Sequence, residues 1–201
     1  MRKPVVSISF TSISFASFSM LVFLVLPFTA NAQGMSLEEA IKKHSGHSVE
    51  WLSEATGASE DEVTAALLAN YRVPIDADKF DEVWGKLTEW ENPLFITIVA
   101  GTVIEVHSKI PMGEYSQGFY NLNSMEGLSG HFQPKNMEAI YIIEEPSREG
   151  GVSRQVAFYD KDGQRIFGIF VNRLASGGEH DAATLAQFQA MNAYYKEQAG
   201  G

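Results

Sequence analysis

Cysteine is absent from the 201-residue chain, and the common catalytic signatures are absent with it. Without cysteine the chain can form no disulfide, thiolate metal site or cysteine nucleophile. The sequence contains no G-x-S-x-G elbow, phosphate-binding glycine loop, H-E-x-x-H pair or dinucleotide fingerprint. Positive charge is also scarce, because 15 Lys and Arg stand against 25 Asp and Glu, a formal net charge of -10. An acidic body repels phosphate backbones and anionic lipid, so we expect neither nucleic acid nor a membrane surface as a partner.

The segment 1–34 differs from the rest of the chain in composition. Its only charges are Arg2 and Lys3, residues 20–28 are nearly all apolar, and Ala30-Asn31-Ala32 has the small-x-small pattern that signal peptidase recognises. These features are typical of a secretory signal, which would send the chain to the periplasm after cleavage at Ala32. The apolar run is shorter than the roughly 20 residues that a membrane-spanning helix needs. Alternatively, Met35 is the true start, and the functional domain spans residues 35–201 without a leader.

Residues 35–92 show helical patterns and predict a helical lobe. Helix starts are indicated by Ser or Asp ahead of apolar positions at helical spacing, with Glu three residues after two of the serines. The expected caps are Ser36, Ser48, Ser59 and Asp78, and Gly57 is expected to end the second helix. The short helices on either side of Gly57 resemble a helix-turn-helix, but the second carries no Lys or Arg, which favours packing or dimer contact over DNA binding.

Residues 93–201 change to strand patterns and end in a helix. Short turns between successive strands favour an antiparallel meander, so the expected fold class is α+β, with helices before and after an antiparallel sheet. Asp160-Lys161-Asp162-Gly163 is expected to form a hairpin turn, and a calcium loop is the alternative. The expected strands are 95–107, with a bend at Gly101, and 119–122, 128–132, 139–143, 155–159 and 166–171, followed by a helix at 182–197.

Four of the five histidines have ordinary explanations. His44 and His47 lie next to lysines in the helical lobe and are expected to be solvated. His180 precedes Asp181 at the start of the last helix, where the pair is expected to act as a cap. His107 ends the first strand, on the same side as Glu105 by the alternation of side chains along a strand.

His131 has a different setting. Alternation places Leu128 and Phe132 on one face of their strand and His131 on the other, so that the imidazole stands away from the core if the apolar face is buried. Gly127 and Gly130 remove bulk beside the imidazole and leave room for a large, flat ligand. The alternative is an exposed polar strand residue with no ligand.

A set of motifs occurs in a fixed order between Gly101 and His131. A strand ending in E-V is followed by the turn I-P-M-G, the strand G-F-Y-N-L and the strand G-L-S-G-H, while F-D-E-V-W with E-W precedes them and I-F-V-N-R follows. In these motifs the chain resembles the HutX/ChuX family of bacterial intracellular haem-utilisation carrier proteins. The resemblance covers roughly residues 37–195.

The resemblance implies a split-barrel-like sheet, related to one half of the larger HemS/ChuS-type haem proteins and often assembled as a homodimer. It also implies reversible binding of haem b as cargo in the cytoplasm, with transfer from a haem importer or to a haem-degrading partner and no chemistry by the chain itself. His131 matches a proposed axial ligand of the family, and a neutral imidazole nitrogen is a common ligand of haem iron.

The chain departs from the family pattern at three positions, Ile98, Gly168 and Asn172, the last of which precedes Arg173 where the family usually has a glycine. Some members carry a second histidine ligand where this chain has Ile98, which cannot bind iron. His107 lies on the same expected strand, but its odd spacing from Ile98 predicts the opposite face, which makes it a poor substitute. Gly168 stands where the family usually has a lysine, so fewer cations are available for the haem propionates.

Two further haem contacts are expected. Arg173 matches a family arginine and is a candidate partner for a propionate, with Arg165 and Lys109 as the other cations on offer. Tyr120 is expected either to contact haem, by stacking on the porphyrin or approaching the iron, or to be a packed aromatic of the sheet. Two other functions remain open at this point, an enzyme that degrades haem or reduces a tetrapyrrole, and a haem-independent regulator built on the helical lobe.

Overall fold

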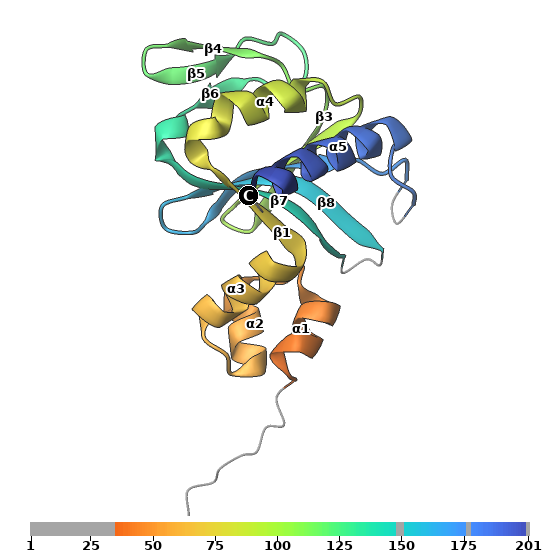
Figure 1. The fold of residues 1–201 in the computed structure, drawn as a ribbon. Coiled ribbons are helices and arrows are strands. Elements are labelled where there is room, and N and C mark those ends of the chain that lie inside the picture. Colours follow the sequence, from red (N-terminus) through yellow and green to blue (C-terminus); the bar gives the residue numbers. More distant parts are fainter. Residues whose placement is uncertain (1–34, 148–150, 176–177, 200–201) are drawn as a thin grey trace, which may run out of the picture. The chain divides into compact units, whose positions relative to one another are not determined.

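The computed structural model of the chain describes residues 35–147, 151–175 and 178–199 (Figure 1). The two interpretations of the segment 1–34 therefore concern residues outside the described ones. No helix in the described ranges is both long enough and apolar enough to cross a lipid bilayer.

Three short helices open the described chain and have a small core of their own. Helix α1 spans Leu37–His44, α2 spans Val49–Thr56 and α3 spans Glu60–Tyr71. The predicted caps at their starts are confirmed, since each serine oxygen accepts a hydrogen bond from a backbone N–H of the first turn, and Ser59 forms the complete capping box with Glu62. Gly57 ends α2 in the left-handed conformation, as expected. The buried residues of this core are Ala40, Ile41, Leu52, Val63 and Leu67.

The last part of the predicted helical lobe packs with the sheet instead. Strand β1 (Arg72–Asp76) pairs with β7, and after the 3-10 turn η1 (Ala77–Lys79) comes helix α4 (Phe80–Thr88). The prediction that Asp78 caps this helix was wrong, because Asp78 lies inside η1 and α4 begins without a side-chain cap. Strand β1 and α4 contribute to the main core through Val73, Ile75 and the buried face of α4.

The strands form two antiparallel sheets, which confirms the α+β class but replaces the expected single meander. The six-stranded sheet has the order β1-β7-β8-β9-β2-β3, and the three-stranded sheet has the order β4-β5-β6. Figure 1 shows α4 and α5 (Ala182–Ala199) on the same side of the larger sheet. The remaining bounds are β2 Pro93–Val99, β3 Thr102–His107, β4 Gly113–Ser116, β5 Phe119–Leu122, β6 Gly130–Phe132, η2 Pro134–Asn136, β7 Met137–Pro146, β8 Val152–Asp160 and β9 Arg165–Val171.

The expected long strand 95–107 is a hairpin. Ala100 and Gly101 both have positive φ, 49° and 78°, and turn the chain between β2 and β3. In the register of this hairpin Ile98 faces Val103 and Leu94 faces His107 across the two strands. Directly opposed residues point to the same face of an antiparallel pair. His107 therefore shares a face with Ile98, and the prediction of opposite faces was wrong, because the turn interrupts the alternation on which it relied.

Trp84 of α4 joins the two sheets at the centre of the main core. Its side chain is 0% exposed, and its Nε1 donates a hydrogen bond to the carbonyl oxygen of Pro111, 2.9 Å away, just before β4. Its indole packs against Phe80 of the same helix and against aromatic rings from both sheets, which are Tyr120, Phe132, Phe158 and Phe167. Trp84 is therefore one of the core residues that hold the three-stranded sheet against the larger one.

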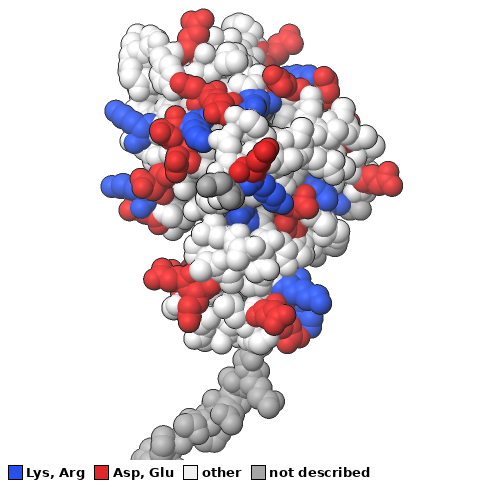
Figure 2. Space-filling model, viewed as in Figure 1, with Lys and Arg blue, Asp and Glu red and all other residues white. Residues whose placement is uncertain are grey.

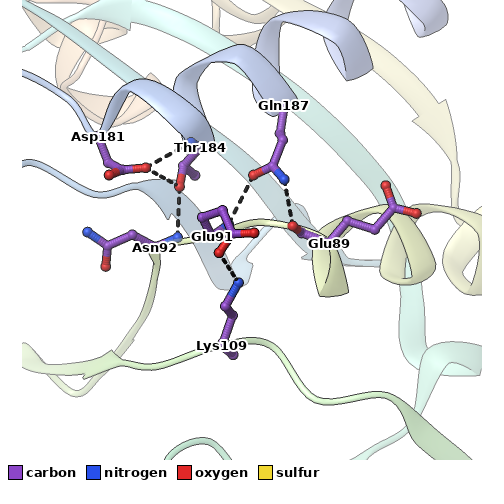
Figure 3. A network of polar contacts seen from close by, with 7 residues as sticks. All are labelled: Glu89, Glu91, Asn92, Lys109, Asp181, Thr184 and Gln187. Carbon is purple, nitrogen blue, oxygen red and sulfur yellow. Dashed lines mark hydrogen bonds and ion pairs between the residues drawn. The ribbon is translucent and has the colours of Figure 1, made fainter.

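A polar network ties the segment after α4 to the start of α5 (Figure 3). The side-chain amide of Gln187 donates to the carbonyl of Glu89 and accepts from the backbone N–H of Glu91, whose carboxylate pairs with Lys109 at 2.6 Å. Nearby, the Thr184 hydroxyl accepts from the backbone N–H of Asn92 and donates to Asp181, which caps α5 as predicted. The network holds the chain in place where β2 begins.

Candidate functional site

His131 occupies the outer face of the three-stranded sheet, as alternation predicts. Its neighbours Leu128 and Phe132 turn inward, where Leu128 is buried and Phe132 packs against Trp84. The imidazole is exposed, and the ring of Phe119 stands edge-on to it with centroids 6.0 Å apart. The imidazole is exposed beside an aromatic edge, on a strand whose inner face packs in the core. In this position its nitrogen could bind the metal of a flat molecule that lies on the sheet.

Asn121 is the direct partner of His131, and sequence reasoning missed it. The two residues face each other across β5 and β6, and the Asn121 Oδ1 lies 2.6 Å from the His131 Nδ1. Asn121 belongs to the G-F-Y-N-L motif, but its relation to His131 depends on the register between two strands. No hydrogen bond to the second ring nitrogen, Nε2, occurs among the described residues, so Nε2 is the nitrogen left for a ligand.

The glycines of two motifs are explained by close approaches that position this sheet. A Cβ on Gly113 would lie 2.5 Å from the Tyr120 ring, so only glycine allows β4 to pass over that ring. Gly127 has a φ of 76°, in the left-handed region that favours glycine, and a Cβ there would lie 2.6 Å from the Cβ of Ser108. The Ser108 hydroxyl accepts a hydrogen bond from the backbone N–H of Leu128, which fixes the entry to β6.

Tyr120 lies in the core rather than on a ligand-facing surface. Its side chain is 4% exposed, and its hydroxyl accepts from the backbone N–H of Gly113 and donates to the Met112 sulfur. Burial raises the pKa of Tyr120, while the bond from Gly113 opposes the shift, so the phenol stays neutral at physiological pH. The packed-aromatic interpretation describes this position, and almost no ring surface is left on which a porphyrin could stack.

The other two predicted residues, His107 and Arg173, line a groove of about 760 Å³ on the six-stranded sheet. Its floor is apolar and comprises Leu94 and Ile96 of β2 and Phe170 of β9. Its walls are polar and charged, and include Glu105, His107, Arg154, Arg173 and His180. The structure thus brings His107 and Arg173 together and places His131 and Tyr120 elsewhere, on the smaller sheet.

The two histidines of the groove have their ring nitrogens engaged. The Oδ1 of Asn172 accepts from the backbone N–H of Arg173, so its Nδ2 faces the Nδ1 of His107 at 3.2 Å and donates to it. A neutral His107 then carries its proton on Nε2, which lies 4.0 Å from the Glu105 carboxylate. In His180 both nitrogens face backbone carbonyls, those of Val171 and Val152. Neither ring presents a free lone pair in this arrangement.

Of the three candidate cations, only Arg173 lines the groove. Its guanidinium donates to the carbonyls of Gly178 and Val152 beside the groove. Lys109 is paired with Glu91, and Arg165 binds Gln155 and lies over the Phe170 ring at 5.8 Å.

The surroundings of Gly168 leave no room for the lysine that the resemblance suggested at this position of the groove floor. A Cβ at this position would lie 2.6 Å from the Gln155 side-chain oxygen and 2.9 Å from the Phe170 ring. Both side chains therefore occupy the space that a longer residue would need, and the ring of Phe170 takes the place of a cation on this part of the sheet.

Comparison with known proteins gives consistent results. Residues 73–191 match the sequence model of the family described as haem utilisation ChuX/HutX. The intracellular heme transport protein HutX of Vibrio cholerae serotype O1 (strain ATCC 39315 / El Tor Inaba N16961) is 26% identical over 147 residues, which cover 73% of this chain and 75% of that protein.

Solved structures agree in fold. A crystal structure of ChuX superposes with a TM-score of 0.68 at 27% identity and covers 81% of this chain and 99% of the other. The crystal structure of apo-PhuS, a heme-binding protein from Pseudomonas aeruginosa, has a TM-score of 0.60 at 16% identity. The match covers 77% of this chain but only 45% of PhuS, so the fold corresponds to about half of the larger protein.

Proposed function

Because this chain belongs to the ChuX/HutX family of haem-utilisation proteins, we propose that it binds haem reversibly and carries it within the cell. The cargo in this proposal is haem b, and the iron ligand is His131. The observation that carries the proposal is the position of that imidazole, which is exposed on a strand anchored in the core, with Nδ1 held by Asn121 and Nε2 left for iron. In the bound state the haem iron would accept the lone pair of this nitrogen.

The carrier and the haem-degrading enzyme differ in what happens after haem binds. We expect addition of haem to the pure chain to give a saturable Soret band that persists when ascorbate is added, because a carrier holds haem as cargo and does not convert it even when an electron donor is supplied. Absorbance spectra recorded over an hour make the test, with free haem in the same buffer as the control. Progressive bleaching of the bound haem by the electron donor would favour the enzyme, and a spectrum equal to that of free haem would favour the regulator.

We propose the groove as the surface that receives the body and propionates of haem. Its apolar floor suits the porphyrin ring, and the charge of Arg173 suits a carboxylate. The protonated Nε2 of His107 fits a donor to a propionate better than a ligand to iron. In this proposal His107 and Arg173 contact haem carboxylates, and iron ligation belongs to His131.

We propose that a second copy of this chain covers the exposed sheet edge beside the groove. Strand β3 is an edge strand of the six-stranded sheet, and it exposes an apolar side chain on each face, Val103 (54% exposed) and Ile104 (47% exposed). Ile98 and Val99 continue the same exposed surface on β2. An apolar edge of this kind is rarely left uncovered in a soluble protein. We propose that a homodimer covers it, and that in this dimer the His131 of one copy lies at the groove of the other.

Substitutions that make the apolar edge polar should therefore lower both the mass of the assembly in solution and its affinity for haem. We expect wild-type chain to have the mass of a dimer in light scattering after size exclusion, and V103E/I104E to have the mass of a monomer, because carboxylates at the edge resist burial. The same variant should bind haem several-fold more weakly, since the groove and His131 no longer meet. Tyr194→Glu, a change at an exposed position on α5, is the matched control. A monomeric wild type, or a variant with unchanged mass and affinity, would contradict the proposed assembly.

The location and partners follow the same resemblance. We propose a cytoplasmic carrier that receives haem from an importer or passes it to a haem-degrading protein, in line with the intracellular heme transport named for HutX. On the face shown in Figure 2, acidic and basic side chains are interspersed, and no extended basic area is visible there. Together with the net charge of -10, this surface supports the expectation that nucleic acid is not a partner.

A further inference from the structure

We infer that Asn121 is a positioning residue that sets the tautomer and orientation of His131 for iron. The inference rests on the proposed haem binding and adds a residue that acts through another side chain. Its starting point is the contact of 2.6 Å between the Asn121 Oδ1 and the His131 Nδ1. Which of the two ring nitrogens remains for a ligand depends on which of them this contact protonates.

The orientation of the Asn121 amide is fixed by the hairpin of β4 and β5. Its Nδ2 donates to the carbonyl oxygens of Glu114 (3.1 Å), Ser116 (3.1 Å) and Phe119 (3.0 Å). Carbonyl oxygens only accept hydrogen bonds, so the nitrogen of the amide must face them. Rotating the amide by half a turn would place Oδ1 against these oxygens. The Oδ1 atom therefore faces His131.

The His131 tautomer follows from this orientation. Because Oδ1 only accepts, Nδ1 of His131 must carry a proton and donate it, and in the neutral ring Nε2 then has the free lone pair. Such second-sphere bonds to the far nitrogen of a ligating histidine fix the ring and increase its basicity. His107 shows the opposite arrangement, since the Asn172 amide presents its nitrogen to Nδ1 and places the proton on Nε2. The chain thus prepares His131, and not His107, as a metal ligand.

The turn between β4 and β5 explains why the amide is held so firmly. Gln117 and Gly118 have positive φ, 53° and 83°, a combination found in tight two-residue hairpin turns. The turn brings the carbonyls of Ser116 and Phe119 to the same side as the Asn121 amide. Asn121 also lies between Glu114 and His131 in the strand register, at the centre of the small sheet. The geometry of His131 is therefore set by backbone atoms through one side chain.

Two variants of the full chain separate positioning from a structural role. Asn121→Leu and Asn121→Asp both lose the donors to the hairpin carbonyls, but only aspartate keeps an acceptor for Nδ1. For Asn121→Leu we expect haem retention to weaken about 10-fold to 100-fold, the iron–histidine stretching frequency to fall and the reduction potential to rise. For Asn121→Asp we expect the frequency to rise and the potential to fall, because a carboxylate draws the Nδ1 proton more strongly and makes the ring a better donor.

The control is Asn136→Leu, which removes an exposed amide bonded to Gln133 and should leave both spectroscopic values as in wild type. Shifts of the same sign in both Asn121 variants, or no shift in either, would overturn the positioning role. If Asn121→Asp fails to fold, Asn121→Leu against this control still decides, since a structural role does not move the stretching frequency. If His131→Ala leaves the haem spectrum unchanged, the proposed iron ligand fails first; if only the Asn121 variants are silent, the iron ligand stands and the inference fails.

Discussion

His131→Ala should release haem at least about tenfold faster than the wild-type chain, a loss of about 1.4 kcal/mol of binding free energy. The substitution removes the nitrogen that we propose as the iron ligand and leaves the strand intact, because the side chain is exposed on the outer face of β6. The Soret band should also move, since its position depends on the axial ligand. Transfer of haem to excess apomyoglobin, followed by absorbance, measures the dissociation rate directly.

His44→Ala is the matched control for this experiment. His44 is also a partly accessible histidine, but it belongs to the ring cluster with His47 and Trp51 in the helical part of the chain. We expect its dissociation rate and Soret position to equal those of wild type. If His131→Ala behaves like His44→Ala, the assignment of the iron ligand is wrong, and the outer face of the small sheet has no role in ligation.

Trp84→Ala should destabilise the fold by about 3–5 kcal/mol, the usual range for deleting a fully buried tryptophan. The indole is 0% exposed and joins the rings of both sheets, and its loss also leaves the Pro111 carbonyl without its donor. For a chain of this size such a loss lowers the melting temperature by roughly 10 °C. Urea unfolding followed by circular dichroism measures the free energy of unfolding.

Trp84→Phe serves as the comparison, because a phenyl ring keeps most of the buried surface and loses the indole N–H. We expect it to lose less than half of the stability that alanine loses. The alanine variant should also bind haem more weakly, since Tyr120 and Phe132, which support the strands of Asn121 and His131, pack against Trp84. A change in unfolding free energy below about 1 kcal/mol would contradict a central role for this residue.

Local signals were sufficient to predict where α1, α2 and α3 begin and where α2 ends. Ser48, Ser59 and Gly57 act through hydrogen bonds and backbone angles within a few residues, so their effect is visible in the sequence. Asp78 shows the limit of such signals, because it lies within the 3-10 turn η1 that precedes α4. Strands β1 and β4 were missed, since each is short and owes its conformation to pairing, β1 with the distant strand β7 and β4 with β5.

For the candidate site residues, too, positions that depend on one strand were predicted, and positions that depend on strand pairing were not. The outward direction of His131 was predicted correctly, because alternation along one strand decides it. The face of His107 was predicted wrongly, because the turn at Ala100 and Gly101 could not be distinguished from a bend within a strand. Asn121 was not found at all, since only the register between β5 and β6 brings it to His131. Residues that act through cross-strand contacts are not visible until the pairing is known.

Electron–nuclear double resonance can show whether Nε2 of His131 binds haem iron, as we propose. The ferric haem complex would be prepared from chain grown with nitrogen-15 histidine, and the spectra of wild type, His131→Ala and His44→Ala compared. We expect a strong coupling from a histidine nitrogen in wild type and in His44→Ala, and its loss in His131→Ala. A histidine coupling that persists in His131→Ala, or the absence of any histidine coupling in wild type, would contradict this proposal.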